Sequence, residues 1–169
     1  FLVPYRNGEP YHHKPPLLFW LMHAGWALFG VNDWWPRLIS PLFAAGTLWV
    51  CHRLARLLWP ARPEVAQMAP FVLLASVLYA YFASALMFDA MIAFFVALGW
   101  LGLVQAWKSG AGRGGFVLLS LAMGGALLAK GPVALVHLLP PDLLAPWWMR
   151  EQRPPWRRWY QGELWALLG

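Results

Sequence analysis

The amino-acid sequence predicts an all-α protein that crosses a membrane several times, and three observations support that prediction. Hydrophobic residues make up 60% of the 169 residues and charged residues only 12%, about half the charged share of an ordinary soluble domain. A soluble domain of this size could not hide so much apolar surface. Apolar stretches close to the roughly 20 residues that a membrane-crossing helix needs recur along the chain. Positively charged residues gather at the ends of these stretches.

The composition also excludes several classes of protein. An excess of apolar residues excludes intrinsic disorder. A single cysteine, Cys51, excludes a disulfide framework and a thiolate-cluster metal site. The net charge of +6 is spread over the ends of the apolar stretches, so it indicates membrane topology and no nucleic-acid partner. Gly110–Gly115 fits the letters of a dinucleotide fingerprint, but it follows a membrane helix instead of a strand, which makes it a linker.

The apolar stretches divide the chain into part of a first extracytoplasmic loop, residues 1–33, and a transmembrane bundle, residues 34–169. In the loop, Leu17–Phe29 is too short to cross a membrane and is predicted to be an interfacial helix. In the bundle we expect spans at about 38–58, 65–86, 90–107, 115–129 and 132–149, and a truncated span from 163. Pro140 and Pro141 interrupt the fifth span, and Asp142 is expected to cap the helix that restarts there. Because the chain starts in what reads as the middle of a loop, we expect a fragment of a longer protein.

The orientation follows from the positive charges. If the five spans alternate, nine of the thirteen Lys and Arg residues fall on one side: Arg53, Arg56, Arg62, Lys108, Arg113, Arg150, Arg153, Arg157 and Arg158. The positive-inside rule makes this side cytoplasmic. The other side carries Arg6, Lys14, Arg37 and Lys130.

The candidate functional residues lie on the non-cytoplasmic side, at the mouths of the helices. Ionisable groups at such depths are costly and are therefore functional candidates. Lys and Arg side chains there would hold phosphate oxygens, and a carboxylate would act as a general base or orient a substrate hydroxyl. The candidates are Lys14, Asp33, Arg37, Asp89 and Lys130.

Each candidate also has a structural interpretation. Asp89 is placed to cap the helix that follows it, a role compatible with a place in the site. Asp33 and Arg37 are placed to form an interfacial ion pair. Lys130 could snorkel to the interface, but the Lys-Gly-Pro sequence breaks the helix there, and broken backbone at membrane depth usually lines a cavity.

Just before Lys14, the segment Tyr11-His12-His13 suggests either a metal site or a polar lining. Adjacent histidines without a third defined ligand favour the polar lining. No cofactor is identified from the residues, and a divalent metal ion remains open.

Five segments resemble one family of membrane enzymes. The segments are Asn7-Gly-Glu-Pro-Tyr11, Lys14-Pro-Pro-Leu-Leu-Phe-Trp20, Phe29-Gly-Val-Asn32, Met87-Phe-Asp-Ala90 and Ala129-Lys-Gly-Pro-Val133. In this order they resemble the polyprenyl-phosphate-sugar glycosyltransferases of the GT-C membrane fold, which include the bacterial aminoarabinose transferases of lipid A and related protein mannosyltransferases. The resemblance covers essentially the whole chain.

The resemblance implies transfer of a sugar from a polyprenyl-phosphate donor to lipid A, another glycan or a protein, at the periplasmic face of the bacterial inner membrane. It implies that Lys14 contacts the departing lipid phosphate and that Asp89 is the catalytic candidate, an active-site carboxylate near the sugar or acceptor. Further substrate-binding candidates are Tyr11, His13, Arg37 and Lys130. The principal catalytic aspartate of the family would precede residue 1. Many relatives carry an acidic residue where this chain has His13, which bears on any metal site.

Two other classes compete with this interpretation. A transporter of an anionic or lipid-linked substrate would also place charges and broken helices within a bundle. However, its polar groups usually lie near the middle of the membrane, between the halves of an internal repeat, and no such repeat is found here. A purely structural membrane subunit would leave unexplained why Lys14, Asp89 and Lys130 fall on one side.

Overall fold

The computed structural model describes residues 5–6, 9–10, 14–85, 88–149 and 155–168, and these confirm the all-α prediction. Two short strands, β1 (Tyr5–Arg6) and β2 (Glu9–Pro10), form an antiparallel hairpin near the N-terminus. The helices are α1 (Leu17–Phe29), α2 (Trp34–Leu58), α3 (Pro63–Leu74), α4 (Val77–Ser84), α5 (Phe88–Lys108), α6 (Arg113–Lys130), the 3-10 helix η1 (Pro132–Ala134), α7 (Leu135–Leu143), α8 (Ala145–Trp148) and α9 (Trp156–Leu168). Helix α1 has the bounds expected from the sequence, and its place at the membrane interface stays a prediction.

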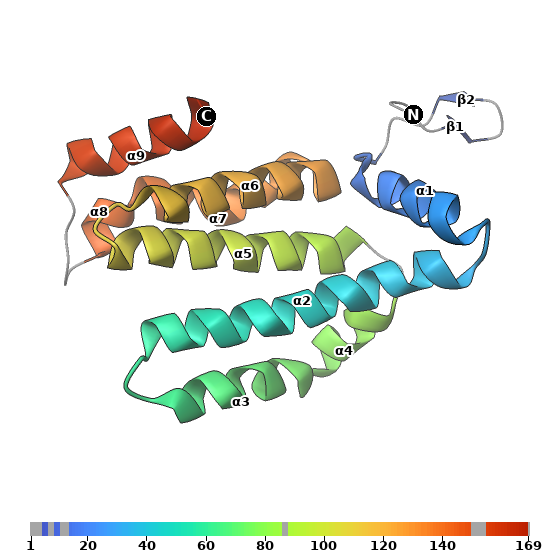
Figure 1. Ribbon diagram of the computed structural model, residues 1–169, viewed down its shortest axis with the longest axis horizontal. Helices are drawn as coiled ribbons and strands as arrows, with labels where there is room; N and C mark the ends of the chain where they lie inside the picture. Colours follow the sequence, from blue (N-terminus) through green and yellow to red (C-terminus); the bar gives the residue numbers. More distant parts are fainter. Residues whose placement is uncertain (1–4, 7–8, 11–13, 86–87, 150–154, 169) are drawn as a thin grey trace.

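Among the described residues, three helices are long and apolar enough to cross a membrane. They are α2, α5 and α6, with mean hydropathies of 1.2, 1.8 and 1.2 over their most apolar windows. They lie side by side along the long axis of the molecule (Figure 1). Together with the composition, they make the chain part of a polytopic membrane protein.

The segment expected as one span over 65–86 is two helices, because α3 and α4 meet at an angle of 69°. Ser76 lies between them with the extended backbone of an N-cap residue, so the helix ends and starts again. Tyr79 donates a hydrogen bond of 2.6 Å to the carbonyl oxygen of Ala44, which ties α4 to α2. No residue of α4 is buried within the chain, so the apolar surface of α4 is free to face lipid or further protein.

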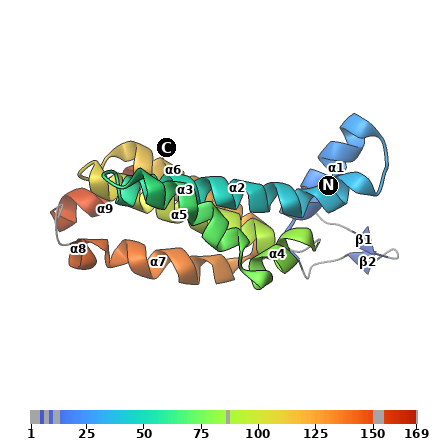
Figure 2. The same ribbon diagram turned by 90° about the horizontal axis from the view of Figure 1, so that it is seen from below.

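The segment expected as one span over 132–149 is divided into η1, α7 and α8. Figure 2 shows these pieces running back alongside α5. The break lies at Leu144, and not at Pro140 and Pro141, which the structure accommodates inside α7. A proline is tolerated best in the first turn of a helix, where its missing N–H would have no partner, and Pro146 occupies that turn of α8.

This arrangement corrects the expected role of Asp142. Asp142 lies within α7, and the N-cap position of α8 is held by Leu144. The Asp142 side chain is buried, and its Oδ1 atom accepts no hydrogen bond from the described part of the chain. It therefore points into the packing between helices instead of capping one.

The antiparallel packing of α5 against α6 forms the centre of the bundle. Glycines let the two backbones approach closely, as small residues commonly do between membrane helices. A Cβ atom on Gly102 would lie 2.7 Å from the backbone nitrogen of Leu119, and one on Gly115 would lie 2.3 Å from that of Ala106. Neither contact leaves room for a side chain, so the close approach requires glycine at both positions.

Two clusters of buried side chains lie at the two ends of this helix pair. The first cluster joins the start of α5 to α1, α2 and the end of α6 through Leu18, Ile39, Met91 and Ala129. The second cluster joins α5 and α6 to α7, α8 and α9 through Leu103, Ala106, Phe116, Leu119, Leu138, Ala145, Met149 and Trp159. The first cluster positions the candidate site described below.

We expect Gly102→Ala and Gly115→Ala each to destabilise the protein by about 1–3 kcal/mol, because the added methyl group must push two helix backbones apart. The measurement is the unfolding of the full-length protein in detergent. Gly124→Ala on α6 is the matched control, since a Cβ at Gly124 meets nothing within 4 Å. Replacing glycine inside a helix should stabilise the control by about 0.5–1 kcal/mol. Equal effects at all three positions would contradict the close approach.

Candidate functional site

The candidate site lies at one end of the bundle, where three helix ends meet. Helices α5 and α6 are antiparallel, so the start of α5 lies beside the end of α6, and α1 lies at the same end (Figure 1). Asp89 is in the first turn of α5, Lys130 is the last residue of α6, and Lys14 lies just before α1. Residues far apart in the sequence therefore carry their charges to one place.

Lys130 and Asp89 form an ion pair. The Lys130 Nζ atom donates a hydrogen bond to Oδ1 of Asp89. Their side chains are 35% and 37% exposed, so a ligand outside the bundle can reach both groups. Each charge also suits its helix, because a carboxylate is favoured at a helix start and an ammonium group at a helix end. Asp89 lies inside the first turn, not at the cap position before Ala90 that the sequence suggested.

The chain turns sharply after Lys130. Gly131 has φ of 78° and donates a hydrogen bond of 2.8 Å to the carbonyl oxygen of Leu127, which ends α6. This backbone region favours glycine, and Pro132 cannot continue the helix. A Cβ at Gly131 would lie 3.8 Å from Cγ of Pro15, so this turn lies next to the segment that carries Lys14.

Phe88 connects Lys14 to Asp89. The Lys14 Nζ atom lies 5.4 Å from the centre of the Phe88 ring, a cation–π distance. Phe19 of α1 packs edge-on against the same ring, with centroids 6.3 Å apart. The sequence pattern does not single out Phe88, although this residue directly precedes Asp89. A hydrophobic residue in an apolar stretch carries no signal of such a contact.

The first buried cluster explains why these charges converge. Four of the five described candidates are close in sequence to one cluster residue: Lys14 to Leu18, Arg37 to Ile39, Asp89 to Met91, and Lys130 to Ala129. Packing four helices through Leu18, Ile39, Met91 and Ala129 therefore brings the neighbouring polar residues to the same end. The packing of these apolar side chains holds the helix ends together, and the charged side chains lie beside the cluster.

Arg37 lies at the same end of the bundle, but within the described residues it forms no ion pair with the other candidates. It is exposed in the first turn of α2, and within the described residues it forms no ion pair with Asp33. The expected Asp33–Arg37 pair is therefore absent. Tyr11 and His13 lie outside the described residues. In the described part, no three His, Cys, Asp or Glu side chains lie together as metal ligands.

The geometry can bind an anion and orient a hydroxyl group. The Lys14 ammonium group is exposed, and a phosphate group can take charge-assisted hydrogen bonds from it. Asp89 uses Oδ1 for Lys130, while Oδ2 has no partner in the described part of the chain and is able to accept a hydrogen bond from a ligand. Lys130 restrains the direction of that carboxylate.

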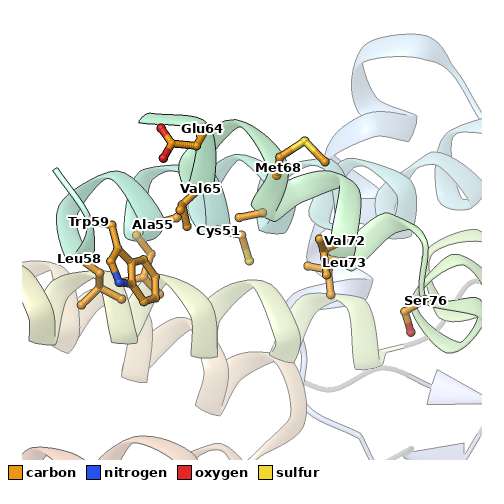
Figure 3. Close-up of a pocket in the computed structure, with 12 residues that line it drawn as sticks. Cys51, Ala55, Leu58, Trp59, Glu64, Val65, Met68, Val72, Leu73 and Ser76 are labelled. Carbon is orange, nitrogen blue, oxygen red and sulfur yellow. The ribbon is translucent and has the colours of Figure 1, made fainter. Parts of the chain in front are cut away.

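A second feature lies away from these charges. A groove of about 780 Å³ lies between α2 and α3. Figure 3 shows Cys51, Val65, Met68 and Leu73 among its lining residues. Most of its lining is apolar, and Glu64 is its one charged residue. Such a lining offers no cation to a phosphate group, so the groove is not part of the candidate site.

Curated relatives match the chain along most of its length. It is 32% identical over 161 residues to the undecaprenyl phosphate-alpha-4-amino-4-deoxy-L-arabinose arabinosyl transferase of Pseudomonas aeruginosa strain UCBPP-PA14, covering 93% of this chain and 28% of that protein. It is 29% identical over 156 residues to the corresponding transferase 1 of Pseudomonas fluorescens strain Pf0-1, covering 90% of this chain and 27% of that protein.

The chain thus spans between a quarter and a third of the length of these relatives. No solved structure matches it significantly. The family description "Dolichyl-phosphate-mannose-protein mannosyltransferase" matches residues 13–159, which include Lys14, Asp89 and Lys130. This match covers most of the chain, and the protein belongs to that family of GT-C membrane proteins.

Proposed function

We propose that this chain is part of a membrane glycosyltransferase that moves a sugar from a polyprenyl-phosphate donor to an acceptor. The observation that carries the proposal is the juxtaposition of the Asp89–Lys130 ion pair with Lys14 at one end of the bundle. The relatives named as undecaprenyl-phosphate aminoarabinose transferases support a donor of this chemistry.

The reaction replaces the bond between the sugar C1 and the phosphate oxygen by a bond to an acceptor oxygen. As the C1–O bond breaks, its electron pair stays on the phosphate oxygen. Lys14 stabilises that developing charge, and a preorganised cation is a strong contributor to such a step. The acceptor hydroxyl attacks C1 and loses its proton to a base.

Asp89 has a positioning role in this proposal. Its Oδ2 atom accepts a hydrogen bond from a hydroxyl group of the sugar or the acceptor, while Lys130 holds Oδ1. Arg37, Tyr11 and His13 are further substrate-binding candidates. A bundle of membrane helices suits a donor whose polyprenyl tail stays in the bilayer, since only the phosphate and sugar need to leave it.

The site is proposed to face the periplasm from the bacterial inner membrane, because the positive-inside rule puts Arg53, Arg56 and Lys108 on the cytoplasmic side. The acceptor is lipid A, another glycan or a protein. The transporter hypothesis is less favoured, since Lys14, Asp89 and Lys130 gather at helix ends, whereas transporter sites lie near the middle of the membrane.

We expect Lys14→Ala in the full-length protein to lower sugar transfer by about 100-fold, the size of effect typical for loss of one group that stabilises a developing oxyanion. The assay follows transfer of labelled sugar from undecaprenyl-phosphate sugar in membranes with matched protein levels. Arg62→Gln, at the opposite end of the bundle, is the control. Lys14→Ala with the same rate as wild type would rule out the proposed phosphate contact.

A charge exchange separates a substrate contact of Asp89 from a purely structural ion pair. We expect Asp89→Asn to lower transfer strongly and to cost at most about 1 kcal/mol of stability, since the pair is partly exposed. The double variant Asp89→Lys/Lys130→Asp restores an ion pair but moves the carboxylate. It should therefore keep the pair, lose at most about 2 kcal/mol of stability to the reversed charges at the two helix ends, and still transfer sugar poorly. Recovery of transfer in this double variant would mean that only the ion pair matters.

A further inference from the structure

Two adjoining hollows lie at the other end of the bundle, where α2 and α5 end and α6 begins. The first, of about 260 Å³, is lined by Arg53, Arg56, Leu57, Leu101 and Gln105. The second, of about 440 Å³, is lined by Leu57, Gln105, Lys108, Ser109, Gly112, Gly114 and Gly115. Leu57 and Gln105 line both, so the two hollows adjoin, and we call them together the cationic cavity.

The lining of the cationic cavity carries three positive charges and no negative one. Arg53, Arg56 and Lys108 supply the charges, and within the described residues none of them forms an ion pair. Arg53 lies 5.7 Å from the ring centre of Trp49, and Lys108 lies 4.6 Å from that of Trp107. Like charges around one cavity repel each other, so a bound anion would relieve the repulsion.

The cavity is at the depth of lipid headgroups. Asp89 and Lys108 are nineteen positions apart in α5, which corresponds to about 28 Å of helix. A bilayer has a hydrocarbon core of roughly 30 Å. With Asp89 at one membrane surface, Lys108 therefore lies at the other, and Figure 1 shows the ends of α2 and α5 and the start of α6 together there.

The shape and the remaining lining suit a phosphate that is attached to acyl chains. Gly112, Gly114 and Gly115 line the cavity without side chains, and a Cβ at Gly114 would meet nothing within 4 Å. The start of α6 adds the partial positive charge of a helix N-terminus. Leu57 and Leu101 add apolar side chains to the lining beside the cations. Basic pockets between membrane helices are a known way of holding anionic lipid headgroups.

We propose that the cationic cavity binds the phosphate headgroup of an anionic glycerophospholipid in the leaflet opposite the Asp89–Lys130 site. The phosphate lies among Arg53, Arg56 and Lys108, and Gln105 donates a further hydrogen bond. The acyl chains run along α2 and α5 into the bilayer. This lipid site is distinct from the proposed sugar-transfer site, so its test does not depend on the proposed function.

Native mass spectrometry of the detergent-purified full-length protein tests the proposal. Wild type should bind palmitoyl-oleoyl phosphatidylglycerol at least about tenfold more tightly than the phosphatidylcholine with the same chains. The variant Arg53→Gln/Arg56→Gln/Lys108→Gln should lose that preference. The variant Arg62→Gln/Arg157→Gln/Arg158→Gln removes as many charges outside the cavity and should keep it. Equal losses in both triple variants, or no preference in wild type, would overturn the proposal.

A second pair of variants tests the proposal if the triple variant does not fold. Gly114→Glu places a carboxylate in the cavity at a position with open space, and it should weaken phosphatidylglycerol binding about tenfold. Gly114→Ala should leave binding unchanged. Unchanged binding in Gly114→Glu would contradict the proposal. Displacement of the lipid by inorganic phosphate at millimolar concentration would instead identify a free-anion site and also overturn it.

Discussion

The close antiparallel packing of α5 against α6 is the constraint on which the rest of the structure depends. Gly102 and Gly115 bring the two backbones so near that a methyl group at either position would overlap the opposite helix. Because the two helices are antiparallel and similar in length, the start of one lies beside the end of the other. The Asp89–Lys130 ion pair is a direct consequence of this geometry.

The same helix pair gives the two ends of the bundle different chemistry. At one end, Lys130 pairs with Asp89 and Lys14 lies over Phe88, which suits a ligand with both phosphate and hydroxyl groups. At the other end, Arg53, Arg56 and Lys108 line a cavity without any carboxylate, which suits an anion alone. About 28 Å of helix separates the ends, so one bundle carries a mixed site at one end and a cationic site at the other.

Sequence patterns predicted the helices well where an apolar run is bounded by clear signals. Leu17–Phe29 follows two prolines and precedes a glycine, and the helix has those bounds. Prediction was weaker inside long apolar runs. The break at Ser76 was not predicted, and the break at Leu144 was expected a few residues earlier, at Pro140 and Pro141. Hydropathy depends on composition, and a bend that keeps every residue apolar leaves hydropathy unchanged. The burial of Asp142 could not be predicted from its neighbours in the sequence, because the side chains that bury it come from other helices.

The sequence by itself determined the membrane character, the helical class and the family resemblance, and it predicted that Lys14, Asp89 and Lys130 share one side of the bundle. These properties follow from composition, from the length of apolar runs and from short motifs, all of which are local. Only the tertiary structure decided that Lys130 pairs with Asp89, that Lys14 lies over Phe88 and that Arg37 and Asp33 remain apart. Such contacts join residues up to 74 positions apart, from 14 to 88, and they exist because Leu18, Ile39, Met91 and Ala129 pack together.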